Sequence, residues 1–325
     1  MKIAITGGKG GTGKSTIATS LSIELAKKFK VVLVDVDVEC PDDHIILSIK
    51  RNKVKDVETL LPLFDLRYCK KCGKCSQLCK ENAIFFVKGK YPILISQQCN
   101  GCGACLFICP ENTIKKDKQI VGSISQGSIE FDADNFFKSD FFNKNSSESF
   151  KKELARNIQE NFLLISGEVE VGCEATAAVV NATRKYCEQS DQYDFLIIDT
   201  PAGTHCNVIS GLMGIDMAIA VSEPTPLGAH DLELIIKLLK KINEQECEDL
   251  DNCPDGKLIS QTKIIINRSD IGNQDLIQKI SDNHDIDIIE KIPYDKSFLK
   301  KYFAGMPISN QKIMNVANFV RSFNG

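Results

Sequence analysis

A glycine-rich segment at residues 7–16 constrains the fold of this 325-residue chain more than any other feature. It follows a short apolar run at residues 3–5 and precedes apolar residues at helical spacing from Ile17 onward. This order predicts a strand, a tight loop and a helix. Residues 8–15 fit the pattern G-x-x-x-x-G-K-[ST], in which backbone N–H groups and a helix N-terminus surround a phosphate group. The sequence therefore predicts an α/β protein that binds a phosphorylated ligand through this loop.

The loop is expected to supply side chains as well as backbone donors. Lys14 would contact the β- and γ-phosphates, and Ser15 would bind Mg²⁺. A glycine-rich turn that binds nothing is the alternative, and the strand-to-helix context argues against it. The candidate nucleotide-binding residues of the loop are Gly8, Lys9, Gly10, Gly11, Thr12, Gly13, Lys14, Ser15 and Thr16.

A second lysine, Lys9, lies in the loop at a position that phosphate binding does not require to be basic. The segment K-G-G-T-G-K-S-T resembles the deviant Walker A motif of MinD/ParA-like ATPases and of the nitrogenase iron protein. The resemblance implies a homodimer in which Lys9 crosses the interface to the partner's nucleotide. Hydrolysis would then depend on dimerisation, as it does with an arginine finger. A solvated loop lysine is the simpler alternative for this residue.

Two predicted strands end in carboxylates, as strands that reach a functional edge of a parallel sheet do. The run at 31–35 leads into Asp35-Val36-Asp37, which resembles switch I of the MinD family; the resemblance makes Asp37 the residue that positions or activates the attacking water. Turn residues before Pro41 are the alternative. The run at 193–199 ends at Asp199, whose carboxylate would fix Mg²⁺ as in a Walker B motif, and the D-T-P-A-G that begins there resembles switch II.

Residues near the base of a nucleotide are suggested by resemblance alone. Asn267 and Arg268 follow a predicted strand at 263–266, and Asn267 resembles the adenine-contacting residue of MinD-like proteins. Residues 292–295 match a segment that lies near the base in that family. A turn residue at a strand end is the alternative for Asn267.

Eight of the fourteen cysteines form a repeat with an offset of 30 residues, each half reading C-x2-C-x2-C-x3-C. This is the spacing of bacterial two-cluster ferredoxins, in which the fourth cysteine of each run ligates the other cluster. Zinc sites use four ligands in two pairs and explain the repeat poorly. Lys80 departs from the ferredoxin pattern, which has proline there. The predicted 4Fe-4S ligand sets are Cys69, Cys72, Cys75 and Cys109 for one cluster, and Cys99, Cys102, Cys105 and Cys79 for the other.

Two further cysteines suggest a third site. Cys206 lies seven residues after Asp199, and Cys173 lies in V-G-C-E-A, where a helix is expected to open after Val169. Both placements resemble the nitrogenase iron protein, in which two cysteines from each subunit hold one 4Fe-4S cluster across the dimer axis. The resemblance implies a dimer-bridging 4Fe-4S cluster. Ordinary small residues near a loop, a bridging zinc ion and a transient scaffold cluster are the alternatives.

The expected fold is an α/β doubly wound, mostly parallel sheet of the P-loop NTPase type with a small α+β ferredoxin-like insert. The domain boundaries that follow are residues 1–63 and 119–325 for the ATPase and 64–118 for the insert. Within the last part, residues 119–131 are expected to form a short hairpin around Gln126-Gly127, and residues 132–150 a long surface loop.

Charge and hydropathy exclude some function classes. A net charge of −3 gives no basic footprint for nucleic acid. No apolar run approaches ~18 residues and no signal peptide precedes the first strand, so we expect a cytoplasmic protein without membrane contact. A final helix at about 310–323 lacks the cationic face of a MinD-type membrane anchor.

The leading hypothesis is an ATP-binding and ATP-hydrolysing iron–sulfur protein that couples nucleotide-driven dimer changes to electron transfer. Its cofactors would be ATP/ADP, Mg²⁺ and two 4Fe-4S clusters per chain, and its partner a redox protein or cluster acceptor. The alternative is an iron–sulfur cluster carrier or assembly scaffold like the Mrp-type relatives. A MinD-like spatial regulator has no use for eight cluster ligands.

Overall fold

The computed structural model describes residues 1–130, 147–189, 192–248, 261–296, 298, 301 and 308–323. Among these residues, nine strands form one sheet in the order β11-β10-β9-β1-β8-β2-β7-β6-β3. The bounds of its strands are β1 Lys2–Thr6, β2 Val31–Asp35, β3 Asn52–Phe64, β6 Ile114–Gly127, β7 Phe162–Val169, β8 Phe195–Asp199, β9 Met217–Ser222, β10 Thr262–Asn267 and β11 Ile288–Ile292.

The sheet is parallel from β11 to β7, because β1, β2, β8, β9, β10, β11 and β7 pair in the same direction. Only β6 and β3 run antiparallel to their neighbours. The central strands are apolar throughout and fully buried, as expected of strands with helices on both faces. The prediction of a mostly parallel α/β sheet is confirmed.

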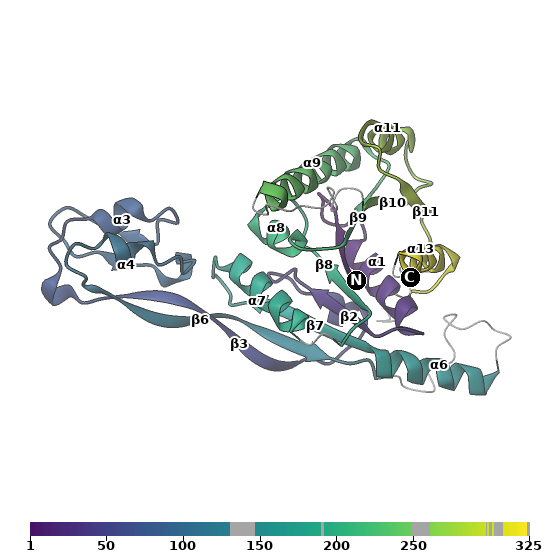
Figure 1. Cartoon of the computed structure of the whole chain (residues 1–325), viewed down its shortest axis with the longest axis horizontal. Helices are drawn as coiled ribbons and strands as arrows, with labels where there is room; N and C mark the ends of the chain where they lie inside the picture. The colour runs from purple at the N-terminus through teal and green to yellow at the C-terminus, as the bar shows by residue number, and fades with distance from the viewer. Residues whose placement is uncertain are drawn as a thin grey trace.

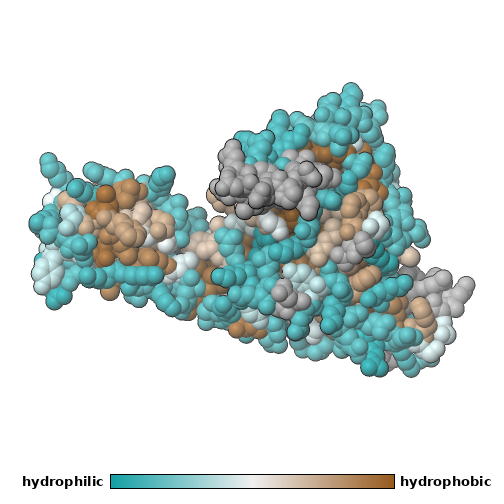
Figure 2. Space-filling model, viewed as in Figure 1, coloured by the Kyte–Doolittle hydropathy of each residue, from teal (hydrophilic) through white to brown (hydrophobic). Residues whose placement is uncertain are grey.

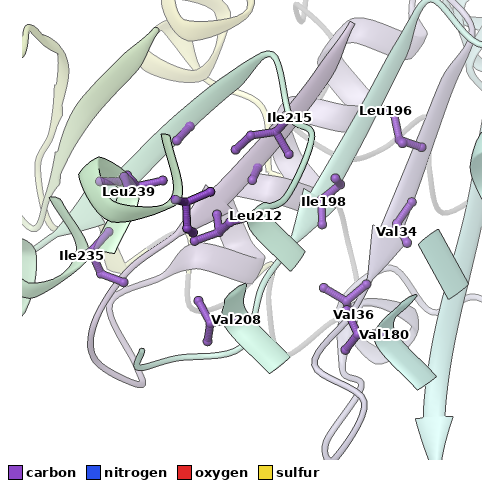
Figure 3. Packing of buried hydrophobic residues seen from close by; sticks show 14 of the residues in the cluster. Val34, Val36, Val180, Leu196, Ile198, Val208, Leu212, Ile215, Ile235 and Leu239 are labelled. Atoms are coloured by element: carbon purple, nitrogen blue, oxygen red, sulfur yellow. The ribbon is translucent and has the colours of Figure 1, made fainter. Parts of the chain in front are cut away.

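Helices cover both faces of the sheet (Figure 1). One face packs against α1 (Lys14–Ala26), α6 (Glu148–Asn161) and α13 (Gln311–Ser322). The other packs against α7 (Thr176–Glu188), α8 (Cys206–Leu212), α9 (Pro226–Glu248) and α11 (Asp275–His284). Figure 3 shows this second core, in which valine and isoleucine side chains of β2 and β8 meet side chains of α7, α8 and α9. Two separate apolar cores therefore hold the central strands rigidly, and the loops at their carboxyl ends rest on this frame.

Strands β3 and β6 extend beyond the sheet as a long two-stranded ribbon (Figure 1). At its far end lies a small unit, residues 65–113, which we call the cysteine module. The module contains the short helices α3 (Lys74–Leu78) and α4 (Ala104–Ile108), the 3₁₀ turns Leu66–Tyr68 and Ser96–Gln98, and a hairpin of β4 (Ile84–Phe85) and β5 (Ile93–Leu94). Gly101 has φ +78°, and a Cβ there would lie 2.9 Å from Thr59 of β3, so the module packs closely against its ribbon.

The expected hairpin at 119–131 is wrong, because residues 119–127 continue β6 and pair with β3 and β7. Gly127, the glycine that suggested the turn, is a glycine for a different structural reason. A Cβ at this position would lie 2.5 Å from the carbonyl oxygen of Lys50, so glycine permits close backbone packing there. Most of the expected loop at 132–150 lies outside the described residues, and Glu148 already begins α6.

Candidate functional site

The glycine-rich phosphate loop joins β1 to α1, in the strand, loop and helix order that the sequence predicted. Gly13 is the N-cap of α1 with φ +91°, and no atom lies within 4 Å of a Cβ built on Gly10 or Gly11. A Cβ on Gly13 would collide with the amide of Asn267. Glycine is therefore required at this position both for its backbone angle and for space.

Lys14 points its ammonium back into the loop. Its side chain is 7% exposed, and Nζ donates a hydrogen bond to the carbonyl of Lys9 at 3.1 Å. Burial lowers the pKa of Lys14, and the nearby carboxylates of Asp199 and Asp37 oppose that shift. Lys9 is half-buried in the same loop, and its role toward a second copy stays a prediction.

Carboxylates from three segments converge beside the loop. Asp35 and Asp199 lie on neighbouring strands in register, and the Ser15 hydroxyl lies near both Asp199 and Asp42 and moderates the rise in the pKa of each. The side chains of Asp35, Asp42 and Asp43 bring carboxylate oxygens within 4.8 Å of one another. Sequence reasoning missed Asp42 and Asp43, although the Asp-Asp pair after Pro41 was a visible signal.

These carboxylates would place several negative charges close together in a buried site, which is unfavourable without a compensating cation or proton. Burial raises the pKa of Asp199 to about 7, and burial also raises the pKa of Asp35, Asp37 and Asp43. Asp43 is fully buried, and neither of its carboxylate oxygens has a hydrogen-bond partner among the described residues. One oxygen of Asp199 is unpaired in the same way. Unpaired buried carboxylates of this kind need a cation or a proton.

A cavity of about 320 Å³ extends from the phosphate loop toward the C-terminal part of the chain. That is the size range of a small-molecule site. It is lined by Gly11, Gly13, Lys14, Ser15, Thr16, Asp42, Asn267, Arg268, Ile292, Pro293, Tyr294 and Asp295, among others.

Asn267 has a bond that the resemblance did not imply. Its amide Nδ2 donates to the carbonyl of Thr12 at 2.8 Å, and its Oδ1 accepts from the backbone N–H of Arg268. Arg268 in turn pairs with Glu223. Asn267 therefore braces the phosphate loop while it lines the cavity. Contact with a base stays a prediction.

The cysteine module contains two cavities, and each is lined by four cysteines. Cys109, from the second half of the repeat, lines the first cavity, and Cys79, from the first half, lines the second. The first is lined by Cys69, Cys72, Cys75 and Cys109, with Pro110 and Thr113. The second is lined by Cys79, Cys99, Cys102 and Cys105, with Pro62 and Ala83.

The remaining candidate cysteines lie in different surroundings. Cys173 is half-buried in the loop before α7, and the expected helix does open at the end of this segment, with Ala175 as its N-cap and Thr176 as its first residue. Cys206 is exposed and is the first residue of α8. The loop of Cys173 also touches the cysteine module, since the backbone N–H of Glu174 donates to the carbonyl of Gln97 at 3.0 Å. Burial raises the pKa of the Cys99 thiol, and the neighbouring sulfur atoms of Cys102, Cys79 and Cys173 raise it further.

Comparison with known families gives a match over nearly the whole chain. Residues 3–308 match the family model described as the CobQ/CobB/MinD/ParA nucleotide binding domain. The chain belongs to this family. Two uncharacterized proteins of Methanocaldococcus jannaschii are each 32% identical to it: MJ0579 over 94% of this chain and 90% of its own, and MJ0578 over 75% of each.

Solved structures of the family agree with this CobQ/CobB/MinD/ParA chain in fold. The septum site-determining protein MinD from Pyrococcus horikoshii, solved with Mg-ADP, has a TM-score of 0.53 at 18% identity and covers 100% of this chain and 97% of its own. Apo McdA from Cyanothece has a TM-score of 0.53 at 12% identity, covering 100% and 99%. Identities this low speak for the fold alone.

The residues of this MinD/ParA-type chain fit a bound Mg²⁺. The donor set is oxygen only, namely the Ser15 hydroxyl and buried carboxylates with unpaired oxygens, and oxygen donors are what Mg²⁺ prefers. Ser15, Asp199 and Asp42 would hold the ion together with phosphate oxygens. The ion would neutralise charge on the phosphates during transfer.

None of the helices in the described part of the chain has the length and apolar character that a membrane span needs.

We expect Asp43→Asn to stabilise the protein in the absence of Mg²⁺. The pKa of Asp43 is raised in the folded state, so ionisation of this carboxyl opposes folding at neutral pH, and the penalty disappears below the unfolded pKa near pH 4. The neutral amide cannot ionise, so it removes the cost of burying this charge, and we expect the gain to raise Tm by about a few degrees.

Thermal unfolding in EDTA between pH 4 and pH 8 measures this effect. The gain should be largest at pH 7–8 and vanish toward pH 4. Glu39→Gln, an exposed neighbour, is the matched control and should leave Tm unchanged at every pH. Destabilisation by Asp43→Asn at pH 8 would contradict the interpretation of Asp43 as an unpaired buried carboxyl.

Proposed function

We propose that this chain is an ATP-hydrolysing iron–sulfur protein, active as a homodimer, in which the nucleotide state controls electron transfer through 4Fe-4S clusters in the cysteine module. The phosphate loop, the switch carboxylates and the family membership support the ATPase half of this proposal. The cysteine module supports the other half. Residues 64–118 form the iron–sulfur insert in this proposal, and residues 1–63 and 119–325 the ATPase.

The observation that carries the iron–sulfur proposal is the lining of the two cavities. Each cavity has four cysteines, and each takes three from one half of the repeat and the fourth from the other half. This is the crossed arrangement that two-cluster ferredoxins use. A zinc site would not require thiols to be exchanged between the halves. The cavities therefore favour two all-cysteine 4Fe-4S clusters.

A continuous set of contacts supports coupling between the nucleotide and the clusters. Asp199 leads through switch II into α8, and the guanidinium of Arg184 on α7 donates to the carbonyl of Ser210 on α8 at 2.7 Å. The loop that precedes α7 then contacts Gln97, two residues before Cys99. A shift of switch II on hydrolysis has a packed route to a cluster ligand.

We expect MgATP to change the reduction potential of a cluster, and Glu174→Pro to abolish that change. Proline lacks the N–H that bonds the Gln97 carbonyl, so this contact would be lost. In the wild type we expect a shift on the order of 60 mV between MgATP and MgADP, a tenfold change in a one-electron equilibrium. Anaerobic redox titration followed by EPR measures it.

Glu174→Ala is the matched control, because it keeps the backbone N–H and should retain the shift. Iron content and ATPase rate should be unchanged in both variants. A wild-type potential that is insensitive to nucleotide would contradict the coupling. Transfer of a cluster to an apo-acceptor protein during the assay would instead favour the carrier alternative.

We also propose that Cys173 and Cys206 of two chains hold a third, dimer-bridging 4Fe-4S cluster. Two cavities imply about 8 Fe per chain, and a shared cluster adds about 2, giving about 10. Cys206→Ser should lower the anaerobic iron count to about 8 and weaken the dimer. Cys40→Ser, at another exposed cysteine, should leave the count at about 10. A wild-type count of about 8 that neither Cys173 nor Cys206 variants change would remove the bridging cluster.

A further inference from the structure

The cysteine module has a surface that its own chain leaves uncovered. On α3 and α4, Phe107 is 91% exposed, and Leu78 and Ile108 are 40% and 38% exposed. Figure 2 shows this hydrophobic patch over α3 and α4, bordered by hydrophilic residues. Apolar side chains gathered in this way on a small unit mark an interaction site more often than a solvent face. We call the surface formed by these three residues the α3/α4 face.

The cysteine module that carries the α3/α4 face is rich in exposed lysines. The cysteine module has seven basic and three acidic residues. Two acidic residues are already paired within the module, Asp65 with Arg67 and Glu111 with Lys70, and the third, Glu81, accepts a hydrogen bond from Asn100. The lysines that form no ion pair among the described residues are Lys71, Lys74, Lys80, Lys88 and Lys90.

Three of these lysines lie beside candidate cluster ligands in the sequence. Lys71 and Lys74 flank Cys72, an exposed cysteine of the first cavity, and Lys80 follows Cys79 of the second. Lys74 and Leu78 are four residues apart on α3, so they lie on one side of the helix. Cluster thiolates would place their negative charge inside the cavities, while the ammonium groups remain on the outer surface. An approaching protein therefore meets positive charge beside exposed apolar side chains.

We propose that the α3/α4 face is the docking surface for a small acidic iron–sulfur protein that exchanges electrons with the module. This inference rests on the proposed iron–sulfur function and names the class of its redox partner. The lysines steer an acidic partner by charge, and Phe107 supplies the apolar contact at the centre. In the exchange, one electron leaves the partner's reduced 4Fe-4S cluster, which becomes oxidised by one unit. The electron enters an oxidised cluster of the module, and no bond forms or breaks.

The test uses the full-length holoprotein and a purified acidic two-cluster ferredoxin, reduced with dithionite, as the probe. Anaerobic stopped-flow absorbance measures the second-order rate constant at several salt concentrations. In the wild type the rate should fall as salt rises, because charge steering is screened. Lys74→Glu combined with Lys80→Glu should lower the low-salt rate about 10-fold and flatten its salt dependence. Phe107→Ser should lower the rate about 10-fold at every salt concentration.

The control is Lys241→Glu combined with Lys279→Glu, an equal charge change at exposed lysines of α9 and α11. Figure 1 places these helices away from the module, and this variant should react at the wild-type rate. Phe107 is almost wholly exposed, so its loss should leave folding, iron content and ATPase rate unchanged. Rates equal to wild type in both module variants would overturn the docking surface.

Two further outcomes separate this inference from others. If Phe107→Ser dissociates the homodimer in sedimentation experiments and leaves the rate unchanged, the face joins two copies of this chain and the proposal is overturned. Absence of acid-labile sulfide from the anaerobic wild-type protein, before any probe is added, would instead show that the iron–sulfur function itself has failed.

Discussion

Lys14→Ala should lower the affinity for MgATP by about 100-fold or more. The Lys14 ammonium is buried in the loop and would make charge-assisted hydrogen bonds to the β- and γ-phosphates, each worth about 1.5–3 kcal/mol. Backbone dipoles cannot replace a full charge at that point. Isothermal titration with MgATP measures the loss, and circular dichroism checks that the variant folds, since Asp199 loses its neighbouring cation.

Lys9→Ala is the matched control in the same loop. If Lys9 acts on the nucleotide of the partner copy, its removal should keep ATP affinity within about threefold of wild type and slow hydrolysis by about 1,000-fold, the scale of an arginine finger supplied in trans. Asp37→Ala should behave in the same way, because Asp37 would act on the attacking water. Unchanged ATP affinity in Lys14→Ala would contradict the phosphate-loop assignment.

Cys72→Ala should lower the anaerobic iron content of the module from about 8 to about 4 Fe per chain, with an equal loss of acid-labile sulfide. A cluster that loses one of four thiolates is released, while the other cavity keeps all of its cysteines. Cys40→Ala, at an exposed cysteine outside the module, should keep the full count. Zinc without labile sulfide in the anaerobic wild type would contradict the prediction.

The crossed ligand sets give this prediction a sharper form. Cys109→Ala should destroy the same cluster as Cys72→Ala, although the two residues belong to different halves of the repeat. Cys79→Ala should destroy the same cluster as Cys102→Ala. EPR spectra and reduction potentials of the surviving cluster distinguish the two pairs. Spectra that sort by sequence half, with Cys79→Ala resembling Cys72→Ala, would contradict the crossed arrangement.

Local sequence was sufficient for the elements whose signal is periodic or spaced. The apolar runs at β2, β8 and β10 predicted buried parallel strands, because a strand covered on both faces must be apolar throughout. The glycine-rich sequence at 7–16 predicted a tight loop, since glycines adopt backbone φ angles that other residues avoid. The cysteine spacing predicted two sets of four thiols, and the same two sets are among the residues that line two cavities of the module; their role as cluster ligands stays a prediction.

Long-range pairing was beyond the reach of local sequence. The sequence of Ile114–Gly127 has no periodicity that distinguishes one long strand from a hairpin. Its partner strand, Asn52–Phe64, is separated from it in the sequence by the whole cysteine module. Pairing between strands so far apart in the sequence depends on the tertiary arrangement. A glycine near the end of a strand resembles a turn residue in the sequence, because its close contact with Lys50 is visible only in the structure.

The chain's own sequence determined the phosphate loop and the candidate cluster ligands, because short-range backbone geometry and ligand spacing are encoded locally. Only the tertiary structure decided that Asp42 and Asp43 join Asp35 and Asp199, that Asn267 braces the loop through Thr12, and that the loop of Cys173 rests on the segment before Cys99. The first two contacts join segments at the carboxyl ends of the parallel strands, and the third joins the loop after β7 to the cysteine module. Charge interactions and hydrogen bonds between these segments depend on distance rather than on sequence spacing.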